Sequence, residues 1–466
     1  MCRSALIAIP ALGVALPEDA FAQGWLGDRQ RQDGQGLRTG DFEFHPGIGA
    51  EVGYDSNWFL RSYKDGPNVV NAAPAAPVRD GVLLRVTPSL SVNTVAKPAT
   101  EGGVLADRPL RFSGNIAATY REFFGAEELR KQRNVSGNVG VRADINYGRP
   151  IGFAIYAGYQ RLIQPAVVSD PNLSFNRSDV SAGAEVTVIP GGGTLDLRGS
   201  YTLRAQLFEE SNGVPFNRIN HEVAERNRWR FRPRTALFHE TALWFVSYPN
   251  ADRAFNYLDD STPVRTRIGL TGLVTERVGT TLAAGYGATF QKNTALAPQY
   301  DSWLAQADVV FYLSQSPGRN EPGENTLLLS TITLGYLHDF QLSFLGNYYT
   351  SDRIHGGVGY WFGNRAIINL TLFGERLGYP DVFVNTGPGA TPALAAGEFS
   401  NYRVGGDLFA EYRVAPTVGI NTTIGYSEMF SDTQLPAGGA GPGGVPQVYD
   451  LNWRRFQAFV GARWFY

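Results

Sequence analysis

The end of the chain, from Trp453 to Tyr466, alternates between two kinds of side chain. Counting back from Tyr466 to Phe456, every second residue is apolar, whereas the other set includes Arg463 and Arg455. A period of two residues is that of a β-strand, because successive side chains of a strand point to opposite faces. One apolar face, one partly polar face and aromatic residues at the end are typical of a strand that has lipid on one side and water on the other.

The same alternation recurs from Phe42 onward, most clearly between residues 195 and 207. No apolar run approaches the ~18 residues of a membrane helix, so the membrane signal is the alternation itself. Apart from 97–109 and 314–325, which are longer than usual for the short side, the connections form two groups, which are short turns on one side of the strands and long loops on the other. The short ones are 148–150, 190–193, 232–233, 277–279, 363–364 and 415–416, and the long ones are 55–81, 339–351, 379–399 and 430–452.

This pattern predicts an all-β fold, a transmembrane antiparallel up-and-down β-barrel of about eighteen strands, within a range of about 16 to 20. An even number of strands places both termini on the periplasmic side of an outer membrane. Residues 1–22 are predicted to be a signal peptide, with Arg3 before an apolar stretch and Ala20-Phe21-Ala22 at the cleavage site. Residues 23–41 are polar and are predicted to form a short, flexible periplasmic leader, and residues 42–466 form the barrel.

Motifs for catalysis or cofactor binding are not evident in the sequence. The five histidines are scattered, and the single cysteine, Cys2, lies in the predicted signal peptide. Neither a Cys/His metal cluster nor a Gly-x-Ser-x-Gly motif occurs, so we expect no enzyme, no cofactor and no metal site. The net charge of −2 gives no reason to expect a nucleic-acid partner. The partners expected are outer-membrane lipid and, during biogenesis, the barrel-assembly machinery, with Phe456, Trp464 and Tyr466 as the insertion signal.

The inward-facing positions are rich in arginine, most densely between residues 195 and 267. In one interpretation these arginines pair with carboxylates across strands and only keep the wall wet. In the other they form a stripe that attracts anions, as rings of basic side chains do in anion-selective pores. The candidate selectivity residues are Asp196, Arg198, Arg204, Arg226, Arg228, Arg230, Arg265, Arg267, Arg403, Asp407, Glu411 and Arg463.

Two stretches resemble the beta-barrel porin 2 family of Gram-negative outer-membrane proteins. Residues 52–59 (VGYDSNWF) are similar to the opening motif of that family, and residues 343–353 (SFLGNYYTSDR) to its late polar-aromatic loop. Some members of that family accompany genes for exopolysaccharide secretion, so the resemblance implies a role near polysaccharide export and components of an export system as partners. The leading hypothesis is a porin-like channel or secretion pore for hydrophilic solutes. The alternative is a structural or partner-binding barrel of an exopolysaccharide export system without an open pore.

Overall fold

The computed structural model describes residues 36–63, 78–94, 109–147, 149–163, 176–209, 214–254, 256–313, 330–362, 365–385, 390–440 and 446–466. The predicted signal peptide and residues 23–35 of the predicted leader lie outside the described residues.

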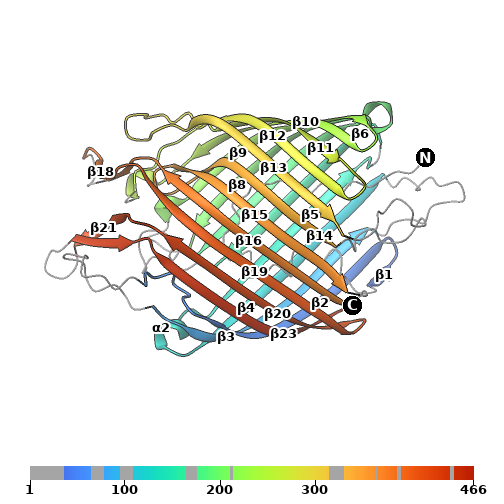
Figure 1. The fold of residues 1–466 in the computed structure, drawn as a ribbon, viewed down its shortest axis with the longest axis horizontal. Coiled ribbons are helices and arrows are strands. Elements are labelled where there is room, and N and C mark those ends of the chain that lie inside the picture. The colour runs from blue at the N-terminus through green and yellow to red at the C-terminus, as the bar shows by residue number, and fades with distance from the viewer. Residues whose placement is uncertain are drawn as a thin grey trace, which may run out of the picture.

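One antiparallel sheet closes on itself to form a barrel (Figure 1). Each wall strand pairs with the next wall strand, and β2 pairs with β23 from Gly47–Phe465 to Asp55–Gln457, which closes the wall. The sheet has nineteen strands, and eighteen of them form the wall once the short β1 is set apart. The predicted fold is therefore confirmed. The wall strands are β2 (Phe42–Asp55), β3 (Gly81–Thr94), β4 (Leu110–Phe124), β5 (Asn134–Ile145), β6 (Ile151–Leu162), β7 (Arg177–Val188), β8 (Leu195–Phe208), β9 (Arg218–Arg232), β10 (Thr235–Ser247), β11 (Val264–Leu273), β12 (Val278–Ala288), β13 (Asp301–Tyr312), β14 (Thr331–Leu342), β15 (Tyr348–Phe362), β16 (Ala366–Tyr379), β19 (Phe399–Ala415), β20 (Val418–Phe430) and β23 (Trp453–Phe465).

The remaining elements are short. The strand β1 (Leu37–Thr39) pairs with the beginning of β2, so residues 37–39 of the predicted leader are part of the sheet. None of the helices among the described residues is long and apolar enough to cross a membrane. The other small elements are the pairs β17 (Val382–Val384) with β18 (Ala393–Ala396) and β21 (Gln434–Ala440) with β22 (Pro446–Asp450), the helix α2 (Glu127–Arg130), and the 3₁₀ turns Pro190–Gly193, Val214–Phe216 and Ala251–Arg253.

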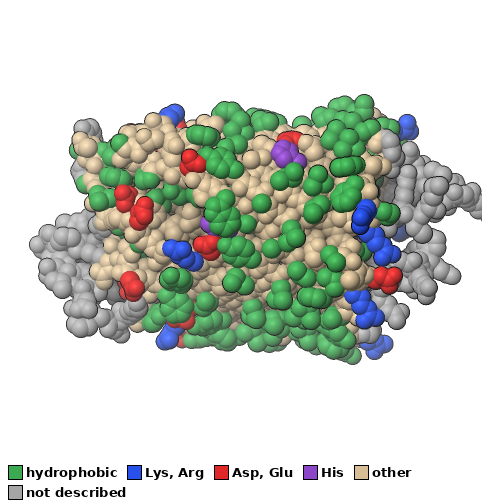
Figure 2. All heavy atoms as spheres, turned by 45° about the horizontal axis from the view of Figure 1, so that its top comes forward, with side chains coloured by type: hydrophobic (Ala, Val, Ile, Leu, Met, Phe, Trp, Pro, Cys, Tyr) green, Lys and Arg blue, Asp and Glu red, His purple; other side chains and the backbone are tan. Residues whose placement is uncertain are grey.

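The two faces of the wall differ as the sequence alternation predicts. Large apolar side chains such as Val460, Trp464 and Leu203 are exposed on the outside, while Phe459 and Phe465, their neighbours in sequence or in the sheet, are buried inside. Figure 2 shows apolar side chains spread over the outer wall. Such an apolar surface suits the hydrocarbon layer of a bilayer. The closed sheet also suits it, because it leaves no unpaired strand edge there.

One predicted loop is shorter than expected. Residues 339–351 were expected to form a long loop, but β14 continues to Leu342 and β15 begins at Tyr348. The sequence is misleading here because the polar residues Asp339 and Ser351 are paired members of the two strands and are buried. Only five residues, 343–347, connect the strands.

Candidate solute path along the inner wall

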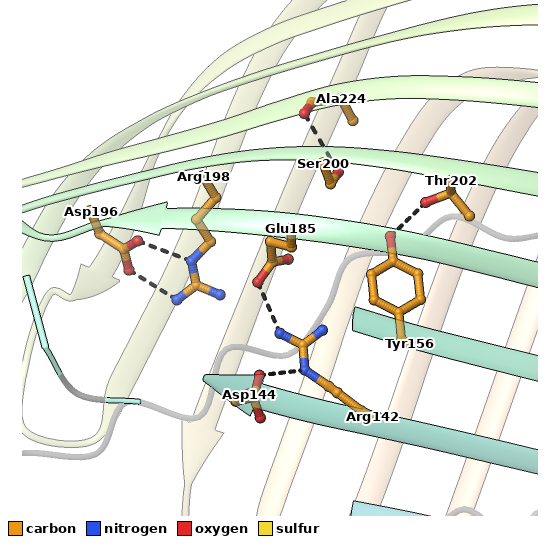
Figure 3. A network of polar contacts seen from close by, with 9 residues as sticks. All are labelled: Arg142, Asp144, Tyr156, Glu185, Asp196, Arg198, Ser200, Thr202 and Ala224. Atoms are coloured by element: carbon orange, nitrogen blue, oxygen red, sulfur yellow. Dashed lines mark hydrogen bonds and ion pairs between the residues drawn. The ribbon is translucent and has the colours of Figure 1, made fainter. Parts of the chain in front are cut away.

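Arginines and carboxylates form ion pairs on the inner face of β5 to β9, two groups of which are drawn in Figure 3. The Arg142 side chain on β5 donates to Asp144, with Nε–Oδ1 at 2.8 Å, and reaches Glu185 on β7, with Nη2–Oε1 at 2.9 Å. On β8, Arg198 donates two hydrogen bonds to Asp196, at 2.9 and 3.0 Å. These pairs lie on alternate residues of their strands, so the same periodicity that exposes leucines to lipid gathers the charges inside.

Two carboxylates of this wall are each shared by two arginines. Asp196 pairs with Arg198 and also with Arg228 on β9, at 3.1 Å. Glu240 on β10 pairs with Arg226 at 2.8 Å and with Arg267 on β11 at 3.3 Å. The two arrangements therefore hold four positive charges against two negative ones. The predicted pairing across strands occurs, yet it leaves an excess of positive charge on β8 to β11.

A tyrosine fits between these charges because a glycine makes room for it. A Cβ atom added to Gly183 on β7 would lie 2.6 Å from ring atoms of Tyr156 on β6. The Tyr156 ring therefore lies flat against the inner wall, and its hydroxyl reaches Thr202 Oγ1 on β8 at 2.6 Å. The ring also lies 5.8 Å from the Arg142 guanidinium, within cation–π range. An alanine at position 183 would push the ring into the lumen.

Solvent reaches this part of the inner wall but not the part next to the closing seam. The side chains of Arg198 and Arg226 are 37% and 46% exposed. Near the junction of β23 with β2, Arg85 and Arg463 are only 3% and 6% exposed. Water therefore contacts the inner face along β5 to β9, which makes this half of the barrel the candidate solute path.

The seam side is packed by pairs of arginine and aromatic rings. The Arg85 guanidinium lies 3.5 Å from the centre of the Phe459 ring and 2.9 Å from Glu51. Arg463 donates to Glu411 on β19 at 2.6 Å, and its guanidinium lies 5.3 Å from the Phe465 ring. These contacts fill one side of the lumen with side chains, so the barrel interior is asymmetric.

The candidate selectivity residues thus fall into different environments. The structure brings Asp196, Arg198, Arg226, Arg228 and Arg267 together, with Arg204 nearby and paired with Glu222 at 3.4 Å. Glu411 and Arg463 lie in the packed seam. Of the others, Arg230 is exposed at the turn end of β9, two residues from Arg228, and Arg265, two residues from Arg267, pairs with Asp339 at 2.9 Å. Arg403 and Asp407 both lie on β19, and Arg403 pairs with Glu375 on β16 at 2.6 Å.

The loop after β2 folds inward rather than outward. Trp58 and Phe59 pack against Leu83, Phe123 and Phe459, which are inner-face residues of β3, β4 and β23. Asp55, at the end of β2, accepts hydrogen bonds from the Arg455 guanidinium at 2.6 to 3.1 Å. The Asn57 amide donates to the backbone oxygens of Arg61 and Arg454, at 2.8 and 3.0 Å, which fixes the loop against the seam.

A second inward loop crosses the opposite part of the barrel end. Phe344 follows β14, yet its ring lies 5.4 Å from that of Phe208 on β8, although β9 to β13 separate these strands in the wall. The Asn347 side chain accepts from the Asp259 backbone N–H at 2.8 Å and donates to the Tyr257 oxygen at 3.2 Å. We name the described loop residues 56–63, 248–254, 256–263, 343–347 and 380–385 the mouth loops, because they narrow the long-loop end of the barrel.

The turn that carries Asn347 needs its particular residues. Gly346 and Asn347 have backbone φ angles of +71° and +68°, in the left-handed region that glycine and asparagine tolerate best. The sequence leaves open whether the loops fold into the lumen. The local sequences Asp55-Ser56-Asn57 and Gly346-Asn347 do indicate tight turns, but nothing in them shows that the turns point into the lumen. The first inward loop begins within residues 52–59 and the second lies within residues 343–353, the two stretches that resemble the porin family.

The predicted insertion signal lies on the outer face at the end of β23. Trp464 is exposed there, and Tyr466 lies beside it with ring centres 6.3 Å apart, whereas Phe456 is exposed near the start of the strand. Within the described ranges, no group of three or more His, Cys, Asp or Glu side chains could hold a metal ion. The expectation that the protein needs no metal stays a prediction.

Comparisons with known proteins give barrels of the same general kind. No family model matches the chain, and no curated protein matches it in sequence. The solved structures that resemble it include OpdK of Pseudomonas aeruginosa with vanillate, at 11% identity and a TM-score of 0.43, covering 91% of this chain and 99% of that one. A BenF-like porin from Pseudomonas fluorescens Pf-5 gives 10% identity, a TM-score of 0.42 and the same coverage. The FrpB iron transporter of Neisseria meningitidis gives 9% identity and a TM-score of 0.43, covering 93% of this chain and 82% of that one.

Proposed function

We propose that the chain is an outer-membrane channel that conducts small hydrophilic solutes and favours anions. The observation that carries this proposal is the inner wall of β8 to β11, where Asp196 and Glu240 are shared by four arginines, of which Arg198 and Arg226 are well exposed to the lumen. An excess of positive charge in a confined, low-dielectric passage attracts anions and raises their local concentration. A barrel of eighteen strands is also too wide for side chains alone to fill.

The remaining parts of the proposal concern biogenesis and relatives. Residues 1–22 direct export, the assembly machinery reads the aromatic end of β23, and both termini stay in the periplasm. Membership of the beta-barrel porin 2 family is supported by the two motifs, both of which lie at the mouth loops. The proposal includes no catalytic activity.

Conductance tests the channel directly. The purified, folded protein is added to a planar lipid bilayer, and liposomes loaded with a neutral sugar provide a second assay for passage. We expect stepwise conductance and sugar-dependent swelling. Folded protein, shown by its heat-modifiable mobility in gels, that gives neither signal would contradict the channel.

The alternative is a closed barrel that serves an exopolysaccharide export system, and the mouth loops favour it. Four of the five ranges contact one another: besides the Asn347 contacts, Asn385 donates to the Ala254 oxygen at 2.7 Å and the Tyr257 N–H to the Phe383 oxygen at 2.9 Å. In that case the wild type does not conduct, and Asn57→Ala combined with Asn347→Ala opens a pore by releasing two loops. Conductance of the wild type equal to that of the double variant would argue against closure by these loops.

A further inference from the structure

A polar cluster interrupts the apolar outer face of β9, β10 and β11. Glu225 Oε1 lies 2.7 Å from His239 Nδ1, and His239 Nε2 lies 3.3 Å from Thr266 Oγ1. Thr266 is 3.1 Å from Thr241, and the Asn227 amide donates to Glu225. We call Glu225, Asn227, His239, Thr241 and Thr266 the outer polar cluster. Figure 2 shows histidine and acidic side chains among the apolar ones on the outer wall.

The register places this cluster outside the barrel. His239 pairs with Ile268, whose side chain is exposed on the outer face, and Glu225 is two residues from Val223, which is exposed on the same face. The side chains of Glu225 and His239 are 37% and 45% exposed. Their sequence neighbours Arg226 and Glu240 point inward and pair with each other at 2.8 Å.

The cluster lies near the middle of the wall, not at a membrane interface. Glu225 is the eighth of the 15 residues of β9. Exposed aromatic residues flank it along the barrel, with Trp229 toward the turn end of β9 and Phe245 toward the loop end of β10. In the described strands, the other outward Asp, Glu, Lys and Arg side chains lie at or near the long-loop ends: Glu122, Arg161, Glu209, Asp301, Asp352, Arg376, Glu428 and Arg454.

A carboxylate and an imidazole in this position are costly against lipid. Charged side chains at the lipid face of a barrel cost up to about 2–4 kcal/mol at the bilayer midplane, although less for acidic residues. Ionisable residues at this depth almost always face protein or water rather than acyl chains. We propose that the outer polar cluster is the contact surface for a second copy of this chain.

The chemistry of the surface favours a second copy because it is self-complementary. Across a two-fold axis, Glu225 of one copy would accept from His239 or Thr241 of the other, and the same contact would repeat in reverse. Gly199 on β8 pairs with Glu225 in the sheet, and an added Cβ there would meet no atom within 4 Å, so an open notch lies beside the cluster. Apolar side chains surround the polar centre, as in membrane interfaces where polar groups hold packed surfaces together.

Cross-linking in native membranes tests the surface. A short bismaleimide is applied to two variants. Thr241→Cys lies at the centre of the cluster, and Val460→Cys lies at mid-strand on β23, elsewhere on the wall. The unsubstituted parent sets the background that comes from Cys2. We expect a band of twice the mass for Thr241→Cys alone. Glu225→Leu combined with His239→Leu should weaken dimerisation in detergent about tenfold, since two symmetric polar contacts are lost, while the barrel stays heat-modifiable.

Four outcomes would overturn the proposal. The first is a monomeric wild type with no Thr241→Cys product, and the second is equal cross-linking at both positions. The third is a Thr241→Cys product whose mass requires a different protein, which would assign the surface to another partner. A dimer of unchanged strength in the Glu225→Leu/His239→Leu variant would also place the interface elsewhere.

Discussion

Leu203 and Arg204 are neighbours on β8 whose side chains lie on opposite faces of the wall. Leu203 is exposed among apolar residues on the outside, whereas Arg204 pairs with Glu222 inside. Replacing Leu203 with arginine should lower the free energy of unfolding in lipid by roughly 2–4 kcal/mol, and Arg204→Gln should cost much less. Urea unfolding in vesicles measures both. Equal labelling of Leu203→Cys and Arg204→Cys by a water-soluble maleimide would contradict the register.

Glu411 and Arg463 show how a buried ion pair acts in the seam. Glu411 is almost fully buried and accepts from Arg463, and Arg413 also lies close to it. Glu411→Gln should destabilise the barrel by about 3–5 kcal/mol because it leaves a buried arginine without its partner. Adding Arg463→Gln should recover part of that loss in a double-mutant cycle of unfolding free energies. Losses that simply add would show that the two side chains do not depend on each other.

The sequence could not settle which way His239 and Glu240 point, and the reason is physical. Alternation identifies a strand when one face is apolar, but here both neighbours are polar. The structure places His239 outside and Glu240 inside. A polar residue facing the membrane breaks the rule on which the prediction rests, so the outer polar cluster could not be found from the pattern. The inward arginines could be predicted, but the sharing of their carboxylates depends on contacts between strands.

At the scale of elements, the loop 56–63 is tied to the helix α2 by charge. Arg61 donates to Glu128, with Nη1–Oε2 at 3.1 Å, and this hydrogen bond is the main reason that the pKa of Glu128 lies below its ordinary value of 4.5. A lowered carboxylate pKa means that the contact stabilises the fold above the ordinary value and is lost as pH falls through the lowered one. We therefore expect protease access to this loop to rise only in strongly acidic solution.

Glu128→Gln is the matched control for that pH dependence. The variant should show the higher protease access already at neutral pH and no further change from this contact on acidification. If wild type and variant respond identically to acid, other carboxylates control the loop.

The closing strand β23 makes a further prediction at this scale. It pairs with both β20 and β2, and Trp464 contributes to its apolar outer face. Deleting residues 464–466 removes these pairings at the end of the strand and the predicted insertion signal. We expect the protein to be lost from outer-membrane fractions in its heat-modifiable form. Normal levels of folded protein there would contradict the proposed signal.

For the whole molecule, the barrel combines a packed half with a solvated half. The alternation predicts a closed wall because each strand carries its own two-faced pattern. It predicts neither the packed seam nor the mouth loops, since both depend on side chains from distant parts of the chain, such as Phe344 against Phe208. We therefore expect the inner wall of β5 to β11 to determine ion selectivity and the seam to determine stability.

The reversal potential across a salt gradient in a planar bilayer tests this account most directly. The wild type should prefer anions at low ionic strength, and the preference should weaken with salt as the screening length falls to about 10 Å at 0.1 M. Replacing Arg198, Arg204, Arg228 and Arg267 by glutamine should reduce the preference. Clear cation selectivity in the wild type, or a preference unchanged in the fourfold variant, would contradict the assignment of selectivity to this wall.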